Sequence, residues 1–183
     1  MANIDVMDRR LRGALSGVEA YMERNDNRVD QTIMVDQTWN IRKICTYVRR
    51  QGQVGILRIL CHGSPSFLQL GTGIRTPRDT TAFQLLRNIW AGEYPRIEVH
   101  ACAVASSTNI ACTFRWRPPG RDCTPGTLTR NSPAMQMLQS MADNAGVLVS
   151  ASPDYQNNRP GFEGRVVHFR PAVYFTMRNL IRR

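Results

Sequence analysis

The sequence predicts an α/β fold with a mostly parallel central sheet and helices on both of its faces. Three observations support this class. Short aliphatic runs alternate with segments of helical periodicity, glycine-containing turns separate them, and two of the runs end abruptly in a reactive side chain. Buried parallel strands have this nearly continuous apolar character because helices cover them. With 183 residues, the chain is expected to form one domain, 1–183, with a core over about 30–170.

The first half of the chain is expected to contain two helices, two strands and a hairpin. An N-terminal helix is predicted over about 5–24, because apolar residues recur there near helical spacing: Val6, Leu11, Leu15, Val18, Met22. The elements that follow are a strand at Thr32–Asp36, a helix that Thr38 could cap, a strand at Ile56–Leu60, and a hairpin at Ser66–Ile74 that turns at Gly71–Gly73.

The second half is expected to contain two helices and three strands, separated by one long basic loop. In order they are a helix opened by Asp79 or Thr80, a strand at Arg96–Ala101, the loop over about 103–131, a helix starting at Ser132–Pro133, and strands at Gly146–Ala151 and Arg165–Phe169. A structureless connection this long inside a compact domain is usually functional or mobile.

The charge of the chain is strongly basic, with a formal net charge of +10. Lys43 is the only lysine, so arginine dominates. Arginine binds carboxylates and phosphates in a bidentate manner, so an acidic partner is one interpretation. A solvated basic surface is the simpler interpretation, and it is the one that we favour.

The cysteines and the N-terminus favour a cytoplasmic protein. The five cysteines form no dense, regular disulfide framework, which favours a reducing compartment. The first residues show no charged-then-apolar signal pattern, and no apolar run approaches the roughly 18 residues that cross a bilayer. Secretion by a route that needs no N-terminal signal stays open.

Two predicted strands end in side chains that can perform thiol catalysis. Ile56–Leu60 is followed by Cys61, His62 and Gly63, and Arg96–Ala101 is followed by Cys102. The carboxyl ends of neighbouring parallel strands line one crevice, where ligands bind. A histidine and a cysteine in that crevice are the minimum equipment for a thiol nucleophile, because the attacking species is the thiolate.

Gly63 and the small residues beside Cys102 fit the same chemistry. The tetrahedral oxyanion of acyl transfer needs a backbone N–H with nothing in its way, and Gly63 can supply it. The Cys102 N–H is the second candidate donor. Ala101 and Ala103 leave room on either side of the thiol.

The motifs resemble those of the cysteine peptidase clan that contains caspases, gingipains, legumains and metacaspases. The chain is most similar to an uncharacterised caspase-like domain of large bacterial surface proteins. The likeness spans about 30–152, and four motifs in the same order carry it: Cys61-His62-Gly63-Ser64-Pro65-Ser66, Leu68-Gln69-Leu70-Gly71, Ala101-Cys102-Ala103-Val104-Ala105 and Ser150-Ala151-Ser152.

This resemblance implies a caspase-like three-layer α/β/α sandwich with a small hairpin after the His-Gly motif. It also implies a cysteine endopeptidase that acts through a Cys-His dyad. His62 would be the general acid and base, Cys102 the nucleophile, and Gly63 an oxyanion donor.

The resemblance further implies a substrate pocket built around the strand ends. Asp36 falls where metacaspases place an acidic pocket residue, His100 occupies the position of the caspase glutamine, and Asp154 follows the fourth predicted strand. Acidic residues there would favour Arg or Lys before the scissile bond. The partner is therefore expected to be a protein or peptide substrate, and no cofactor or metal is expected.

The chain departs from the bacterial pattern at three positions. Ala101 and Ala103 stand where that pattern has glycine and asparagine, and Ser66 stands where it has glycine after the proline. The turn that follows the histidine is therefore expected to differ.

Other functions compete with the peptidase hypothesis. The chain could be an inactive relative that uses the crevice as a binding module. A less favoured alternative is a nucleic-acid-binding protein, in which basic and aromatic residues grip the ligand: Phe114, Arg115, Trp116, Arg117, Arg121. A metal site formed by Cys61, His62, His100 and Cys102 is disfavoured, because adjacent strand residues point to opposite faces. Arg117, Arg121 and Arg130 would suit self-processing by a protease that prefers basic residues.

Overall fold

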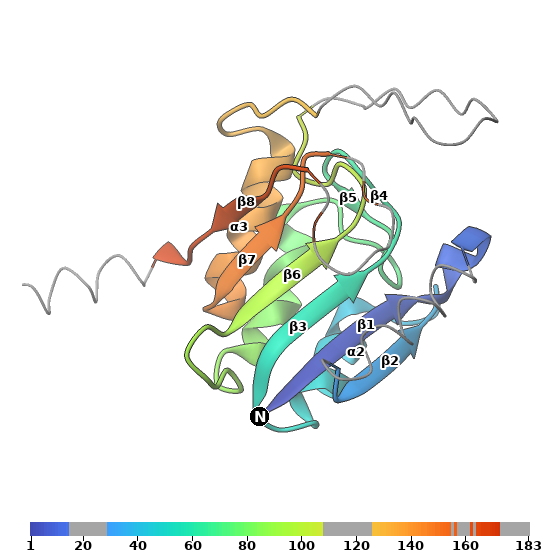
Figure 1. Cartoon of the computed structure of the whole chain (residues 1–183), viewed down its shortest axis with the longest axis vertical. Coiled ribbons are helices and arrows are strands. Elements are labelled where there is room, and N and C mark those ends of the chain that lie inside the picture. Colours follow the sequence, from blue (N-terminus) through green and yellow to red (C-terminus); the bar gives the residue numbers. More distant parts are fainter. Residues whose placement is uncertain (15–28, 108–125, 155, 157–161, 163, 173–183) are drawn as a thin grey trace, which may run out of the picture.

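The computed structural model describes residues 1–14, 29–107, 126–154, 156, 162 and 164–172. It has a six-stranded sheet in the order β2-β1-β3-β6-β7-β8 and a two-stranded sheet formed by β4 and β5 (Figure 1). The strands are β1 (Ala2–Asp8), β2 (Gln31–Val35), β3 (Val54–Leu60), β4 (Gly63–Ser64), β5 (Phe67–Leu68), β6 (Arg96–His100), β7 (Leu148–Ala151) and β8 (Val167–Phe169).

The large sheet is parallel except at one edge. The pairs β1–β2, β1–β3, β3–β6 and β6–β7 are parallel, and β8 pairs antiparallel with β7. The predicted α/β class with a mostly parallel sheet is therefore confirmed. Because the parallel strands point the same way, their carboxyl ends lie together at the upper edge in Figure 1.

Three helices pack on one face of this sheet, behind it in Figure 1. They are α2 (Ile41–Arg49), the 3-10 helix η2 (Pro77–Leu86) and α3 (Pro133–Ala145). Local sequence sets two of the boundaries. Asn40 caps α2 by accepting from the Lys43 N–H at 2.7 Å, and Gly146 ends α3 in the left-handed conformation with a φ of 69°. The α2 cap is thus Asn40 and not Thr38.

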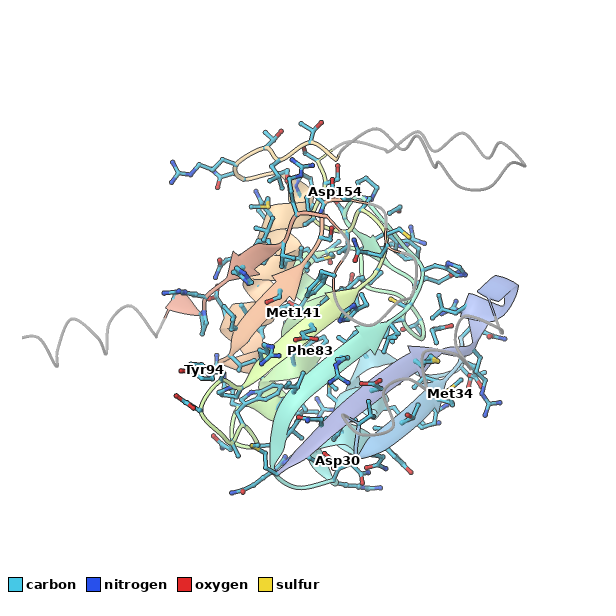
Figure 2. The ribbon with its side chains drawn as sticks, viewed as in Figure 1. Asp30, Met34, Phe83, Tyr94, Met141 and Asp154 are labelled. Atoms are coloured by element: carbon cyan, nitrogen blue, oxygen red, sulfur yellow. The ribbon has the colours of Figure 1, made fainter. Side chains whose placement is uncertain are left out.

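The apolar core lies between these helices and the sheet. Alternate strand residues point into it, since successive side chains of a strand face opposite sides: Ile4, Val6, Leu57, Ile59, Ile97, Val99, Val149, Ala151. Figure 2 shows Phe83 of η2 and Met141 of α3 on the helical side, and both are almost completely buried. The described part of the chain thus contains two of the three expected layers, the sheet and one helical layer.

The predicted N-terminal helix over about 5–24 is wrong at its beginning. Residues 2–8 form β1, the strand between β2 and β3 in the sheet, and a short 3-10 helix η1 (Arg9–Ala14) follows it. Ile4, Asp5 and Val6 alternate as strand residues do, but Met7 and Asp8, both buried, place an apolar and then a charged residue against that alternation. Residues 15–24 of that prediction lie outside the described residues.

The opposite face of the sheet carries a row of polar residues. Pairing in register places them side by side across the sheet, from β2 to β8: Thr32, Asp5, Arg58, Glu98, Ser150, His168. The Arg58 guanidinium donates to Asp5 at 2.9 Å and lies 3.5 Å from a Glu98 carboxylate oxygen. The two faces of one sheet therefore differ sharply in chemistry.

None of the helices in the described part of the chain is a candidate membrane span, and α3, the longest of the α-helices there, has 13 residues.

Candidate functional site

His62 and Cys102 follow the ends of two neighbouring strands. β3 and β6 pair in parallel up to Leu60 and His100, and the Cys61 N–H continues the ladder to the His100 carbonyl at 3.4 Å. Leu60 and His100 thus lie opposite each other, and His62 and Cys102 each come two positions after one of them. The spatial expectation from the sequence, that the two strand ends are neighbours, is met.

Gly63 brings the two strand ends into direct contact. A Cβ added at Gly63 would lie 2.7 Å from the Cys102 carbonyl oxygen, 3.1 Å from the Cys102 backbone nitrogen and 2.8 Å from the Ala101 Cβ. Carbon atoms essentially never approach a backbone that closely, so only glycine fits here. The backbone after His62 is thus packed directly on the backbone of the candidate nucleophile.

From the alternation of β3 and β6 we expect both side chains on the polar face of the sheet. Cys61 and Ala101, which precede them, belong to the apolar core on the helical side. If the alternation continues past the strand ends at Leu60 and His100, the next residue along each chain turns to the other side. His62 is exposed and Cys102 is half-buried, so both can be reached from outside the protein.

The imidazole of His62 is oriented by a backbone carbonyl. His62 Nε2 lies 2.9 Å from the carbonyl oxygen of Arg10, in η1. A carbonyl can only accept, so Nε2 carries the proton of the neutral ring and Nδ1 has the free lone pair. A histidine that must remove a proton from a thiol needs a ring nitrogen in that state.

Arg10 is itself fixed by the hairpin that follows His62. Its guanidinium donates to both oxygens of the Asp8 carboxylate, at 2.8 and 2.7 Å, and to the carbonyls of Gln69 and Gly71. The Gly71 N–H also donates to Asp8 at 2.8 Å. Burial alone would raise the pKa of Asp8, but these hydrogen bonds outweigh it and lower the pKa. Asp8 therefore stays ionised and holds Arg10 in place.

Cys102 sits at the start of a tight turn. Its thiol donates to the Gln156 carbonyl at 3.3 Å, and the next residue, Ala103, has a φ of 52°. Non-glycine residues adopt this left-handed conformation at an energetic cost, and such residues cluster at functional sites. The Ala103 N–H donates to the Asp154 carbonyl at 2.9 Å, which holds the turn.

The other two described cysteines are poor nucleophiles. Cys45 and Cys61 are both buried, and burial raises the pKa of Cys45 to about 12 and also raises the pKa of Cys61. Cys102 is the described cysteine with solvent access. Among the described residues, no group of three or more His, Cys, Asp or Glu side chains is arranged to hold a metal ion. Cys112 and Cys123 lie outside the described residues.

Of the three predicted pocket residues, Asp36 lies farthest from the dyad in the sheet. It follows β2, the end strand of the described sheet, and β1 separates β2 from β3. The strand β1 was not predicted, and the strand end that adjoins β3 belongs to Asp8 rather than to Asp36. Hydrogen bonds from the Thr38 side chain and backbone lower the pKa of Asp36.

His100 lies beneath the strand ends and is 2% exposed. Its Nε2 is 3.2 Å from Glu98, and its ring stacks on Phe162 at a centroid distance of 4.5 Å. Burial opposes ionisation of Glu98, but His100 and Arg96 outweigh it and lower the pKa of Glu98 to about 2. His100 is thus a buried partner of Glu98 in the polar row rather than an exposed contact.

Asp154 lies above the ends of β6 and β7 in Figure 2. Arg165 donates to both of its carboxylate oxygens, and the Gly126 N–H donates to one of them. The side-chain hydrogen bond from Arg165 is the largest cause that lowers the pKa of Asp154, to about 2. Its carboxylate is engaged within the protein.

Sequence reasoning missed Asp8, Arg10 and Gln156. Asp8 and Arg10 would have followed from recognising β1, because an acidic residue at the end of a strand beside β3 is a site signal. Gln156 contributes a backbone carbonyl, for which a sequence carries no signal.

The turn after the histidine keeps the geometry expected of glycine. Ser66 has a φ of 61°, in the left-handed region, within the two-residue turn between β4 and β5. Ser66 therefore adopts a backbone conformation that is strained for serine and that glycine would adopt without strain. The predicted later turn at Gly71–Gly73 is also present, because Leu68 and Ile74 exchange two backbone hydrogen bonds at 3.0 Å across it.

No protein-family model matches this chain, and no curated protein matches it in sequence.

Proposed function

We propose that this protein is a cysteine endopeptidase with a caspase-like three-layer fold, which cleaves peptide bonds through Cys102 and His62. Three features support the proposal. The two residues follow neighbouring strand ends, the alternation of those strands predicts the same face for both side chains, and His62 is exposed while Cys102 is half-buried. The fold alone would not support an activity, because one fold hosts many functions.

The observation that carries the proposal is the contact between Gly63 and Cys102. A Cβ at Gly63 would clash with the Cys102 carbonyl oxygen and amide nitrogen, so the chain after His62 lies against the nucleophile's own backbone. A substrate carbonyl bound beside Cys102 would meet these two backbone segments first. Their N–H groups are the candidate donors for the oxyanion.

In the proposed reaction, the Cys102 thiol leaves the Gln156 carbonyl and turns toward His62. Nδ1 of His62 takes the thiol proton, since Nε2 already holds one and donates it to the Arg10 carbonyl. The thiolate attacks the carbonyl carbon of the scissile bond, forming a carbon–sulfur bond and an oxyanion. His62 then gives the proton to the leaving amine, and the carbon–nitrogen bond breaks.

Water completes the reaction. His62 takes a proton from the water, which attacks the thioester and releases the carboxylic acid, and Cys102 regains its proton. Arg10 contributes by position: its carbonyl fixes which imidazole nitrogen faces the thiol, and the ion pair with Asp8 fixes the carbonyl.

A preference for Arg or Lys before the scissile bond belongs to this proposal as its substrate specificity. The support is the resemblance of the motifs, because the described acidic residues near the strand ends, Asp8, Glu98 and Asp154, each pair with an arginine of the protein itself. Asp36 and Asp154 were the acidic residues expected to set this preference. A peptide library with every residue at the position before the cut measures the preference directly.

The test combines that library with an electrophilic peptide ketone. The wild-type protein is expected to cleave a subset of peptides and to be labelled at Cys102. Cys102→Ala should abolish both, and His62→Ala should reduce cleavage by about 100-fold or more. Cys45→Ala is the matched control, because it removes a buried thiol from the helical side and should leave both readouts unchanged.

An inactive binding module is the alternative, and one observation favours it. In the described conformation, the thiol and the imidazole each bond to a backbone carbonyl, Gln156 and Arg10 respectively. Peptides that bind without cleavage, with equal labelling of several cysteines, would establish this alternative and contradict the peptidase. The basic and aromatic cluster of the nucleic-acid hypothesis, 114–121, lies outside the described residues, as do Arg117 and Arg121.

A further inference from the structure

The turn that holds Cys102 is anchored to the chain that follows β7. The Ala103 N–H donates to the Asp154 carbonyl at 2.9 Å, and the Ala105 N–H donates to the Ser152 carbonyl at 3.2 Å. The Cys102 thiol itself donates to the Gln156 carbonyl. Three successive contacts therefore tie residues 102–105 to residues 152–156.

This anchoring maintains a strained conformation. Ala103 has a φ of 52°, a left-handed conformation that is unfavourable for a residue with a Cβ. Strain of this kind persists only where the surrounding structure over-determines it. The direction of the Cys102 carbonyl, and of the peptide bond that joins Cys102 to Ala103, depends on that conformation.

The anchoring segment is locked in turn by the carboxylate of Asp154. Four donors converge on it: Arg165 Nε at 3.0 Å, Arg165 Nη2 at 2.6 Å, the Arg165 backbone N–H at 3.0 Å and the Gly126 N–H at 3.0 Å. Arg165 Nη2 also donates to the Gly126 carbonyl. A carboxylate that accepts a bidentate arginine and two backbone N–H groups is held in one geometry.

Two glycines make this arrangement sterically possible. A Cβ at Gly126 would overlap the Pro153 carbonyl oxygen, and a Cβ at Gly164, whose φ is 76°, would lie 2.8 Å from Asp154 Oδ2. The backbone therefore closes on Asp154 from both sides. We call Asp154, Arg165 and Gly126 the Asp154 clamp.

We infer that the Asp154 clamp positions the nucleophile: the ion pair between Asp154 and Arg165 fixes the left-handed turn at Ala103 and thereby the placement of Cys102. Asp154 and Arg165 are positioning residues in this inference, which rests on the proposed function. It replaces the expectation that Asp154 binds substrate, because the carboxylate is turned toward Arg165 and Gly126.

Breaking the ion pair should loosen the turn without unfolding the domain. The Asp154 side chain is 18% exposed and that of Arg165 is 48% exposed, so water can replace part of what each loses. Ala103 would then relax toward a negative φ and move Cys102 relative to His62. A misplacement of about 1 Å can cost about 100-fold in rate.

The experiment compares Arg165→Gln, Asp154→Asn and the double variant with wild type. Each single variant should lower kcat on the best library peptide by about 10- to 100-fold, with KM changed less than about 2-fold. The double variant should be no slower than either single variant, because both remove the same ion pair. Arg165→Lys, which keeps the charge but not the bidentate geometry, should recover part of the loss.

Arg87→Gln is the matched control. Arg87 is another exposed arginine that donates to backbone carbonyls, those of Asp143 and Asn144, on the helical side of the sheet. Its loss should leave kcat unchanged. Equal effects of Arg87→Gln and Arg165→Gln would overturn the inference, since they would reflect general destabilisation.

A second readout separates this inference from the proposed function. Amide hydrogen exchange at Ala103 and Ala105 should accelerate at least about 10-fold in Arg165→Gln and Asp154→Asn, and not in Arg87→Gln. If wild type cleaves no peptide, the proposed function fails, and amide exchange alone then decides whether the clamp holds the turn. Unchanged exchange at both amides, or an active wild type with unchanged kcat in Arg165→Gln, would overturn the inference.

Discussion

The two faces of the sheet differ in chemistry, although the same strands form both. On the helical face, Leu57 and Val99 pack into a continuous apolar core. On the other face, the residues next along the chain include Arg58, which belongs to the polar row, and His100, which bonds to Glu98 of that row. Successive residues of each strand thus lie on opposite faces, one apolar and one polar.

The difference shows where stability and chemistry are placed. Apolar burial is non-directional and tolerates small shifts, whereas a buried ion pair requires its partners at fixed positions. Since the polar row pairs in register across β1, β3 and β6, it ties these strands to one alignment. The same alignment sets Leu60 opposite His100, two positions before His62 and Cys102 respectively.

The largest expected effect comes from exchanging Arg58 for alanine. This change leaves Asp5 and Glu98 buried without their shared cation, which costs about 3–5 kcal/mol of unfolding free energy at pH 7. Burial already raises the pKa of Asp5, and losing Arg58 raises it further. A raised carboxyl pKa takes up a proton as pH falls, so the loss should shrink toward about pH 4. Urea unfolding across pH measures it.

Leu57→Ala is the matched control on the other face. Leu57 precedes Arg58 in the same strand and is 2% exposed, and its truncation should cost about 2–5 kcal/mol through the cavity that it leaves. No charge is involved, so this loss should not vary with pH. If the losses in unfolding free energy of Leu57→Ala and Arg58→Ala changed with pH in the same way, the chemical difference assigned to the two faces would be contradicted.

The second effect concerns Glu98, whose folded pKa of about 2 lies below its ordinary value of 4.5. A depressed carboxyl pKa stabilises the fold above the ordinary value, and that contribution disappears as pH falls through about 2. The shift corresponds to about 3 kcal/mol. Glu98→Gln should therefore lose about that much at pH 7 and almost nothing near pH 2. Ile97→Val, its neighbour on the helical face, should show a small loss that is independent of pH.

The fold class could be predicted from the sequence because its strongest signals are local. The aliphatic runs at β3, β6 and β7 and the capped helix at Ser132 follow directly from periodicity and helix-capping chemistry. β1 could not be recognised in this way. Its Asp5 is buried together with its ion-pair partner Arg58, which lies 53 positions away along the chain. No local sequence pattern indicates that pairing.

The candidate site also has one part that the sequence predicts and another that it does not. His62, Gly63 and Cys102 could be predicted because each stands at the end of a recognisable strand. The orienting carbonyl of Arg10 and the clamp on Asp154 could not, because backbone groups and tertiary ion pairs carry the interactions. The position of Asp36 in the sheet also could not be predicted, because the strand β1 that separates β2 from β3 was not recognised.

The third effect is local to the edge where the two faces end. Gly63→Ala places a Cβ against the Cys102 backbone and should destabilise the fold by about 1–3 kcal/mol. It should also change the rate at which iodoacetamide alkylates Cys102, because the strand ends must separate. Gly55→Ala is the control at the other end of β3, where an added Cβ meets mainly the flexible Met1 side chain. An unchanged alkylation rate in Gly63→Ala would mean that the contact does not set the position of the thiol.

The smallest effect is expected at the outer end of the polar row, in Ser150→Ala. The Ser150 hydroxyl bonds to His168 Nδ1 at 2.9 Å, but His168 is exposed and can turn to water when the hydroxyl is removed. Alanine leaves no unsatisfied group at this buried position, so the loss should be about 1 kcal/mol, the net value of one ordinary hydrogen bond. The row would then weaken from its ionic centre at Arg58 to its neutral edge. A loss in thermal or urea unfolding as large as that of Arg58→Ala would instead mean that the row acts as one cooperative network, in which the edge and the centre cannot be separated.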